Sequence, residues 1–353
     1  MTIRNQQHPN RPASGNTLDT EAVVKFSLAL LFFVSISVLA NAQFRHTVNR
    51  PVAVPITLPI TDSTPTADNW SDYTPRNTST ILWETDYEFA LEMARSSSRR
   101  LLIYLYADNA STIPEELAAL SIVSASRKFD ANVLDDCFVR SGLCWYVLLK
   151  LPMDAKIIDE NGAEQSIHSL PGFEHMIGHP GLVVIDFECR NTPYYGEVVG
   201  ILPFLRGIPP TAAQTEVFLE LPPGTLTQRT LIYAIRIHPD RPQSTNGEPA
   251  PAVMQAATEH ALFQAERGVL SHHNFGERSY QVRVALGEGG MPAEICAQSQ
   301  SGIGLFEGAI ACVRAWRHSS GHWSIARKYH RYFGYDMARG KNGAWYAVGF
   351  FIN

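Results

Sequence analysis

A continuous apolar run at residues 101–106 (LLIYLY) constrains the fold of this chain more than any other feature. A strand that is apolar at successive positions is buried on both faces, so its sheet needs helices on both sides. A helix is predicted just before the run, because Thr85 and Glu88 have the spacing of a capping box. The sequence therefore predicts an α/β unit that begins near residue 80.

Further helices and strands are expected to alternate after this run. Apolar runs typical of buried strands recur three times, and helices are predicted between the first two strands and after the last. This alternation indicates a sheet that is covered on both sides. The predicted strands are residues 143–151, 182–187 and 195–202, and the predicted helices are residues 114–126 and 226–238.

The order of these elements over residues 80–240 resembles the thioredoxin fold, most closely in the opening that runs from Trp83 to the LLIYLY strand. In thioredoxins a Cys-x-x-Cys motif follows the first long strand. Here residues 107–112 read ADNAST and contain no cysteine. Dithiol chemistry needs a thiolate of low pKa at the following helix N-terminus. The resemblance therefore implies a thioredoxin-like domain without redox activity.

The first 42 residues have the pattern of a secretory signal peptide. Residues 26–40 are uncharged, Lys25 precedes them, and Ala40 and Ala42 have the spacing of a cleavage site. An uncleaved N-terminal anchor is the alternative. In either case we expect a protein that is secreted or lies in the periplasm or cell envelope, with no membrane span after signal cleavage, because no apolar run reaches the length of a bilayer-spanning helix.

Two proline-rich segments predict the domain boundaries. Residues 43–79 are rich in Pro, Thr and Ser, which disfavours a helix or a central strand and predicts an extended spacer. Residues 241–251 (RPQSTNGEPAP) are polar and without periodicity, as expected of an interdomain linker. The predicted folded domains are therefore residues 80–240 and 252–353.

Charge and cysteine content exclude several classes of protein. The 353 residues include 29 Lys and Arg against 34 Asp and Glu, a net charge of -5. This balance lacks the basic surface of a nucleic-acid-binding protein, so no nucleic-acid partner is expected. Five scattered cysteines are too few for a disulfide-rich miniature scaffold and have the wrong spacing for a zinc ribbon.

Two pairs of cysteines are disulfide candidates, because an oxidising compartment preserves disulfides. Cys137 and Cys144 lie seven positions apart, and Cys296 and Cys312 both lie in the last hundred residues. The alternative for the first pair is two buried thiols, and its spacing is wrong for a redox motif. Cys189 has no evident partner.

The C-terminal region is predicted to alternate helices with a hairpin. Amphipathic helices are expected over residues 253–267 and 305–316, the second ending before Gly321. Asn342 and Gly343 lie between two aromatic-rich runs, which is a strong signal for a β-hairpin.

An ordered set of short motifs lies in the same region and resembles the CAP superfamily (cysteine-rich secretory, antigen and pathogenesis-related proteins) in its short bacterial form. The resemblance covers about residues 250–353 and implies an α-β-α sandwich in an extracellular or envelope setting. The combined expectation for the chain is α/β and α+β: a thioredoxin-like domain followed by a CAP-type sandwich. The motifs are LSH at 270–272, AE at 293–294, AW..SSGH at 315–322, FGY at 333–335 and WYAVGFF at 345–351.

In CAP domains two histidines and acidic residues converge on a surface cleft that can take a divalent metal. By motif, the resemblance assigns these roles to His272, Glu294 and His322. Two imidazoles and a carboxylate are suitable ligands for a divalent cation such as Zn²⁺. His273 competes with His272, and Ile295 replaces the Asn that many members of the family have after this Glu.

The resemblance implies an exported binding protein whose cleft takes a metal or another envelope ligand, such as a lipid, a glycan or a protein. The alternative is a metal-dependent hydrolase that uses His272, Glu294 and His322. A further alternative is that the histidines only hydrogen-bond within the cleft, with Glu294 holding an imidazolium. Thiol chemistry through Cys137 and Cys144 is the remaining hypothesis. Because the chain contains neither G-x-S-x-G nor H-E-x-x-H, and no dithiol motif, no enzymatic activity is expected.

Overall fold

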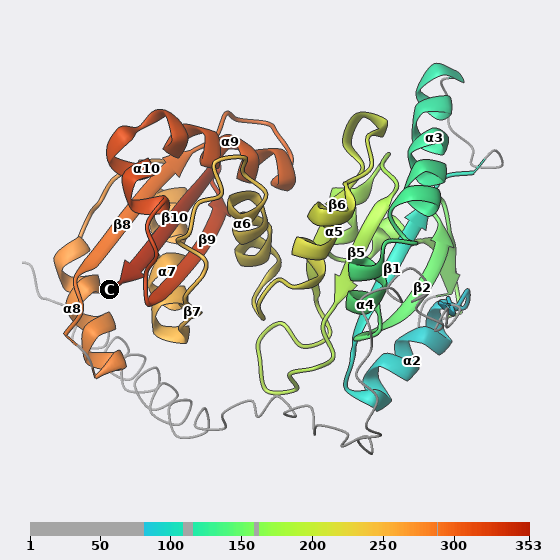
Figure 1. Ribbon diagram of the computed structural model, residues 1–353, viewed down its shortest axis with the longest axis horizontal. Coiled ribbons are helices and arrows are strands. Elements are labelled where there is room, and N and C mark those ends of the chain that lie inside the picture. The colour runs from blue at the N-terminus through green and yellow to red at the C-terminus, as the bar shows by residue number, and fades with distance from the viewer. Residues whose placement is uncertain (1–80, 109–115, 159–161, 288) are drawn as a thin grey trace, which may run out of the picture. The chain divides into compact units, whose positions relative to one another are not determined.

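The computed structural model describes residues 81–108, 116–158, 162–287 and 289–353 (Figure 1). The predicted signal peptide and spacer lie outside the described residues. None of the helices in the described part of the chain is long and apolar enough to span a bilayer. Two four-stranded sheets and a small two-stranded sheet, with helices packed around them, make the described chain a mixed α/β structure.

The first sheet is mixed and has the strand order β2-β1-β5-β6. β1 is parallel to β2 and antiparallel to β5, and β5 is antiparallel to β6. The LLIYLY run lies in β1, where residues 101–105 are fully buried as its sequence predicts. The strands are β1 (Arg100–Tyr106), β2 (Tyr146–Pro152), β5 (Gly181–Ile185) and β6 (Val198–Pro203).

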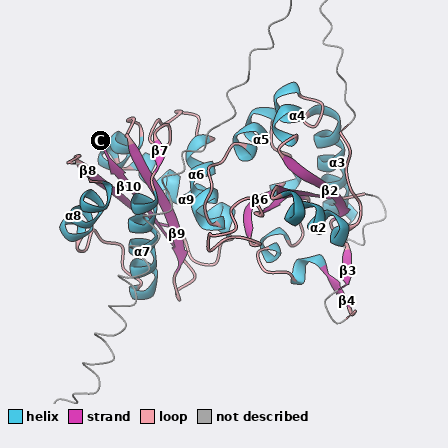
Figure 2. Cartoon of the chain, turned by 90° about the horizontal axis from the view of Figure 1, so that it is seen from below, coloured by secondary structure: helices cyan, strands magenta, loops and turns pink. Residues whose placement is uncertain are grey.

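Helices precede, connect and follow these strands, as the alternating pattern predicts. The predicted closing helix, α6, contacts both β6 and the second sheet. A two-stranded hairpin, β3 (Lys156–Ile158) and β4 (Glu164–Ser166), extends from the connection after β2 (Figure 2). The helices are α2 (Tyr87–Ser97), α3 (Glu116–Asn132), α4 (Cys137–Leu143), α5 (Ala212–Leu219) and α6 (Leu226–Arg236), with 3-10 turns η2 (Ile167–Ser169), η3 (Phe173–Met176) and η4 (Leu205–Gly207).

The start of α2 differs from the prediction. Its N-cap is Asp86, whose carboxylate accepts a hydrogen bond from the Phe89 amide at 2.9 Å. The capping box predicted for Thr85 and Glu88 is therefore wrong, because the N-cap lies one residue later. Asp is at least as good an N-cap as Thr, so the helix begins at the second of two adjacent capping residues.

The second sheet has the strand order β7-β9-β10-β8. β9 and β10 form the predicted hairpin around Asn342 and Gly343, and β8 pairs with β10 in antiparallel fashion. β7 pairs in parallel with the start of β9. The strands are β7 (Glu248–Pro249), β8 (Pro292–Gln298), β9 (Tyr332–Arg339) and β10 (Trp345–Ile352).

Helices cover both faces of this second sheet. On one face the alanines and Val253 of α7 pack against Cys296, Val348 and Phe350. On the other face Cys312 and Trp316 of α9 pack against Ile295 and Ala297. The region is therefore a helix–sheet–helix sandwich. Its helices are α7 (Pro251–Arg267), α8 (Phe275–Leu286), α9 (Leu305–His318) and α10 (Ser320–Ala326).

Two features of this region differ from what the sequence pattern suggests. Gly321 does not end a helix: α9 ends at His318, and α10 begins at Ser320 and carries Gly321 and His322. The segment 241–251, predicted as a linker, is packed: Ser244 is fully buried and its hydroxyl lies 2.7 Å from the hydroxyl of Tyr335. Polar composition predicted exposure, but these polar groups find partners in the second sheet.

All five cysteines are free thiols, so neither candidate disulfide is formed. Cys137 begins α4 and Cys144 caps its other end. Seven residues of helix span about 10 Å, beyond the Cα separation of about 7 Å that a disulfide tolerates. Cys296 and Cys312 lie on opposite faces of the second sheet. Because side chains alternate between the two faces of a strand, Cys296 faces α7 and not α9.

Candidate functional site

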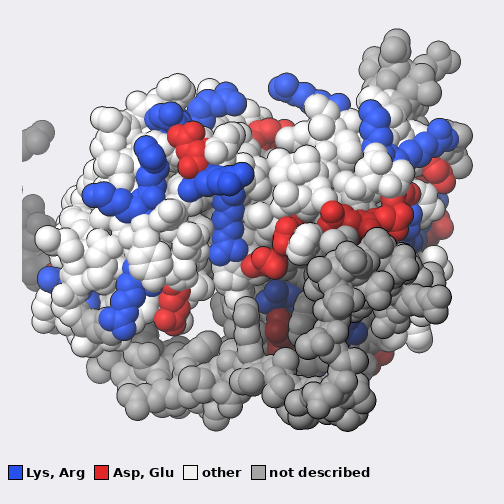
Figure 3. Space-filling view, viewed as in Figure 1, with Lys and Arg blue, Asp and Glu red and all other residues white. Residues whose placement is uncertain are grey.

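Five polar side chains from separate elements meet around one buried carboxylate at the β8 edge of the second sheet. α7 contacts α8, and α10 contacts β8, which brings residues as far apart in the sequence as His260 and His322 into one cluster. Both signs of charge occupy the face seen in Figure 3. The cluster consists of His260 on α7, His272 in the loop before α8, Arg278 on α8, Glu294 on β8 and His322 on α10.

Glu294 is the centre of this cluster. Its side chain is only 1% exposed. Burying a carboxylate is costly unless it is paired, and Arg278 supplies the pairing. Arg278 donates to Glu294 Oε2 from Nη2 at 2.7 Å and from Nε at 3.1 Å. The same guanidinium donates from Nη1 to the carbonyl of His273 at 2.6 Å, which ties the loop before α8 to the site.

His272 contacts the other oxygen of Glu294. Its Nδ1 lies 2.9 Å from Oε1, and its side chain is 48% exposed. Because a carboxylate oxygen accepts, Nδ1 carries the hydrogen in this pair. In the neutral ring Nε2 is then left with a lone pair, which is the state that a metal ligand requires.

His322 lies beside His272 on α10. The centres of the two rings are 5.9 Å apart. Burial, and secondarily the neighbouring His272, lower the pKa of His322, so its neutral form is favoured. The structure thus brings His272 close to both Glu294 and His322. Within the described residues there is no direct hydrogen bond between Glu294 and His322.

The competing candidate, His273, has a different environment. Its ring stacks on that of Phe263, with centres 5.1 Å apart and planes 7° from parallel. Within the described part of the chain its ring has no hydrogen bond to Glu294. Of the two adjacent histidines, His272 is therefore the one that belongs to the cluster.

Two further residues, which the sequence analysis did not assign to the site, lie on the buried side of Glu294. His260 Nε2 is 3.7 Å from Glu294 Oε1 and 2.7 Å from the carbonyl of Ser271. Cys296 Sγ is 3.7 Å from His272 Nδ1. The sequence did contain a signal for Cys296. It follows Glu294 by two positions, and residues two apart on a strand share a face. His260 had no comparable signal, since its contact depends on how α7 crosses the sheet.

His260, Glu294 and Cys296 could together hold a metal ion. One donor atom from each lies within 4.8 Å of the others, and all three residues are buried. Burial lowers the pKa of His260, which keeps its imidazole neutral. Burial, followed by the charge of Glu294, raises the pKa of the Cys296 thiol. The thiol therefore stays protonated unless a cation displaces its proton.

Neither a family model, nor a curated protein, nor a solved structure matches this chain. The cluster combines three imidazoles, one thiol and one carboxylate with a guanidinium that balances the carboxylate charge.

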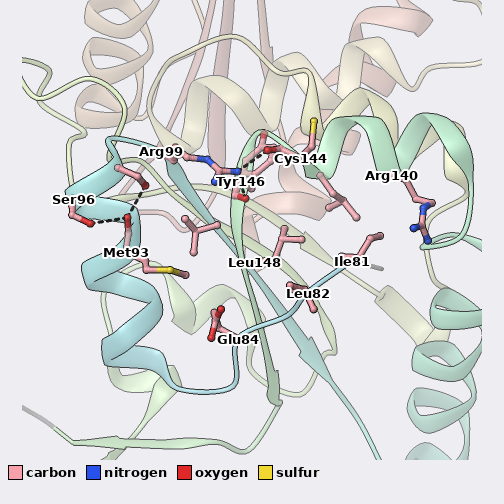
Figure 4. A pocket seen from close by; sticks show the side chains of 13 residues that line it. Ile81, Leu82, Glu84, Met93, Ser96, Arg99, Arg140, Cys144, Tyr146 and Leu148 are labelled. Atoms are coloured by element: carbon pink, nitrogen blue, oxygen red, sulfur yellow. Dashed lines mark hydrogen bonds between the residues drawn. The ribbon is translucent and has the colours of Figure 1, made fainter. Parts of the chain in front are cut away.

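The first sheet offers a separate cavity of about 430 Å³ between α2 and β2 (Figure 4). Two basic residues, Arg99 and Arg140, line it, and Arg99 is engaged by the backbone: Nη2 donates to the carbonyls of Cys144 at 2.6 Å and Tyr146 at 2.5 Å. The Cys144 thiol donates to the Ser141 carbonyl at 2.8 Å. Because α4 holds Cys137 at its opposite end, the cavity brings no second thiol to Cys144. The geometry thus favours a structural role for Arg99 and does not favour dithiol chemistry.

Proposed function

We propose that this chain is an exported binding protein of the cell envelope or extracellular space, and that its C-terminal CAP-like region binds a divalent metal or a small ligand at His272 and His322. Export rests on the signal-like pattern of residues 1–42. The helix–sheet–helix layering of the C-terminal region supports the CAP-like assignment. The parallel β1–β2 pair and the antiparallel β5–β6 pair of the first sheet support a thioredoxin-like domain without its dithiol.

The observation that carries this proposal is the contact between His272 and Glu294. A histidine that binds a metal usually donates its other ring N–H to a carboxylate, which fixes the tautomer and the ring orientation. Here Nδ1 is 2.9 Å from Oε1 of a carboxylate that Arg278 holds in place. Glu294 accordingly acts as a positioning residue, and Nε2 of His272 is the nitrogen available to a ligand.

The two imidazoles also have a suitable separation. Two Zn–N bonds of about 2.0–2.1 Å in a tetrahedral site put the ring centres about 5–6 Å apart. The observed distance between the rings of His272 and His322 is 5.9 Å. The donor set therefore fits a divalent cation such as Zn²⁺ held by two histidines, with positions left for an oxygen ligand. Such a cation would supply the positive charge that recruits an anionic group of an envelope lipid, glycan or protein.

The position of Glu294 favours binding over hydrolysis. A general base needs a free acceptor within reach of a water molecule. Both oxygens of Glu294 are engaged, one by Arg278 and the other by His272. The hydrolase alternative would require Glu294 to release one of these partners.

Metal analysis of the full mature chain tests the proposal. We expect the variant His272→Ala/His322→Ala to bind one equivalent of Zn²⁺ fewer than the wild type after equilibration and desalting. The matched control is His273→Ala, which removes the adjacent imidazole and should keep the wild-type stoichiometry. Circular dichroism confirms that the variants are folded. The same stoichiometry in the wild type and a folded double variant would overturn the proposal.

A further inference from the structure

We propose that His260, Glu294 and Cys296 form a second, buried metal site whose natural ion is zinc. This site goes beyond the proposed function, because it uses a thiol and an imidazole that the cleft formed by His272 and His322 does not need. It also lies on the protected side of Glu294, whereas His272 lies on the exposed side.

The geometry is close to that of a zinc site. Bonds of about 2.0–2.3 Å in a tetrahedron place donor atoms about 3.3–3.8 Å apart. His260 Nε2 lies 3.7 Å from Glu294 Oε1, and the donor atoms of His260, Glu294 and Cys296 all lie within 4.8 Å of one another. The site therefore needs an inward movement of about 1 Å or less to reach these bond lengths.

Regular elements hold the three donors in place. Glu294 and Cys296 are alternate residues of β8, so both face α7. His260 projects from α7, whose neighbouring alanines pack on the same face of the sheet. The exposed fractions of the three residues are 1% for His260, 5% for Glu294 and 4% for Cys296. Such burial keeps the three donor atoms away from bulk solvent.

The donor set selects the type of ion. A thiolate and an imidazole are soft or borderline ligands that suit Zn²⁺, whereas Ca²⁺ and Mg²⁺ prefer oxygen ligands alone. The two negative charges of the Cys296 thiolate and the Glu294 carboxylate would neutralise a divalent ion. Arg278 would remain on the other carboxylate oxygen, Oε2. Three protein ligands leave one position for a water molecule.

Binding requires two rearrangements of hydrogens. The Cys296 thiol loses its proton to solvent as the sulfur–zinc bond forms. His260 Nε2 gives up its contact with the Ser271 carbonyl, and the ring hydrogen moves to Nδ1. His260 Nδ1, which receives the hydrogen, is buried and has no hydrogen-bond partner among the described residues, so the only bond lost is the one from Nε2 to Ser271. No electron transfer is involved.

Cobalt substitution tests this site separately from the outer cleft. We expect metal-free full-length mature protein to develop a thiolate-to-cobalt charge-transfer band on addition of Co²⁺, and Zn²⁺ to abolish the band. Cys296→Ser should lose the band completely. The matched control is Cys312→Ser, because Cys312 is equally buried but lies on the opposite face of the sheet. His322→Ala should retain the band.

A second measurement avoids dependence on the folding of a variant. X-ray absorption of the wild type saturated with zinc at both sites should show sulfur in the zinc coordination shell. A band that persists in Cys296→Ser, or a zinc shell of nitrogen and oxygen alone, would overturn the inner site. These results are independent of the stoichiometry of His272→Ala/His322→Ala, so failure of the outer cleft and failure of the inner site are distinguishable.

Discussion

Arg278 donates two hydrogen bonds to a single carboxylate oxygen of Glu294, from Nη2 at 2.7 Å and from Nε at 3.1 Å. The two side chains are 11% and 1% exposed. This pair joins α8 to β8, and the bond from Arg278 to the His273 carbonyl extends the connection to the loop that carries His272. One guanidinium therefore neutralises the buried charge and orients the histidine loop.

Arg278→Ala is expected to destabilise the protein by about 3–5 kcal/mol, because it leaves a buried carboxylate without its partner. The free energy of unfolding in urea measures this effect. Adding Glu294→Gln should restore part of the loss, since it removes the uncompensated charge. Arg283→Ala, on the same helix, is the control and should cost well under half as much. A loss for Arg278→Ala below about 1 kcal/mol would show that the pair is solvated and not a structural centre.

Gly334→Ala is expected to destabilise the protein by about 1–3 kcal/mol through overpacking. A methyl group at this position in β9 would collide with the carbonyl of Val253 in α7. Gly321→Ala is the opposite case, because the position is helical and no atom lies within 4 Å of the added methyl group. That variant should gain up to about 1 kcal/mol. Thermal unfolding of both variants measures the contrast, and equal effects would contradict the close approach of α7 to β9.

Ser244→Ala tests whether the segment 241–251 is part of the folded core. The hydroxyls of Ser244 and Tyr335 are buried and 2.7 Å apart. Loss of one partner leaves the other unsatisfied, which costs about 1–3 kcal/mol. Ser244→Ala/Tyr335→Phe should therefore cost less than the sum of the single variants in chemical unfolding. Ser301→Ala, at an exposed turn, is the control. Additive effects of the two variants would mean that the segment behaves as the free linker predicted from composition.

Thiol labelling should separate the cysteines into exposed and buried classes. Cys137 and Cys144 are exposed and should react first with an alkylating reagent in the native protein, whereas Cys296 and Cys312 should react only on unfolding. Peptide mass spectrometry after labelling identifies the order. A crosslinked Cys137–Cys144 peptide from non-reduced native protein would contradict the separation that α4 imposes.

The free energy of unfolding should depend on pH through Asp336, whose pKa is raised in the folded protein. Burial raises the pKa of Asp336, although hydrogen bonds from the Thr258 hydroxyl and the Met337 amide act to lower it. The folded protein then holds this proton more tightly than the unfolded chain. The resulting stabilisation is present below the ordinary carboxyl pKa of about 4 and is lost as the pH rises through the raised value.

Asp336→Asn should therefore gain stability relative to the wild type as the pH increases from about 4 to 7. Urea unfolding at several pH values gives this difference. Asp135→Asn, whose parent side chain is 77% exposed, is the surface control for the same substitution. A difference that falls with pH for Asp336→Asn would mean that the folded protein stabilises the charged carboxylate.

Local sequence patterns predicted the elements that short-range physics determines, whereas α8, α10 and β8 of the site were not predicted. The apolar run of β1, the amphipathic stripes of α7 and α9 and the Asn342-Gly343 hairpin are each visible in fewer than twenty consecutive residues. The errors occurred where two adjacent residues could serve the same purpose, as at the start of α2, or where polar groups find distant partners, as at Ser244. Neither case can be resolved from a local window.

The amino-acid sequence singled out His272, Glu294 and His322 through the resemblance of its short motifs to those of CAP domains. It could not indicate that Arg278 occupies one oxygen of Glu294, or that His260 and Cys296 approach it from the buried side. Those contacts depend on how α7 packs on β9 and β10 and how α8 packs on α7, and that arrangement results from packing between segments far apart in the chain. Only the folded structure shows that Glu294 has His272 on its exposed side and His260 and Cys296 on its buried side.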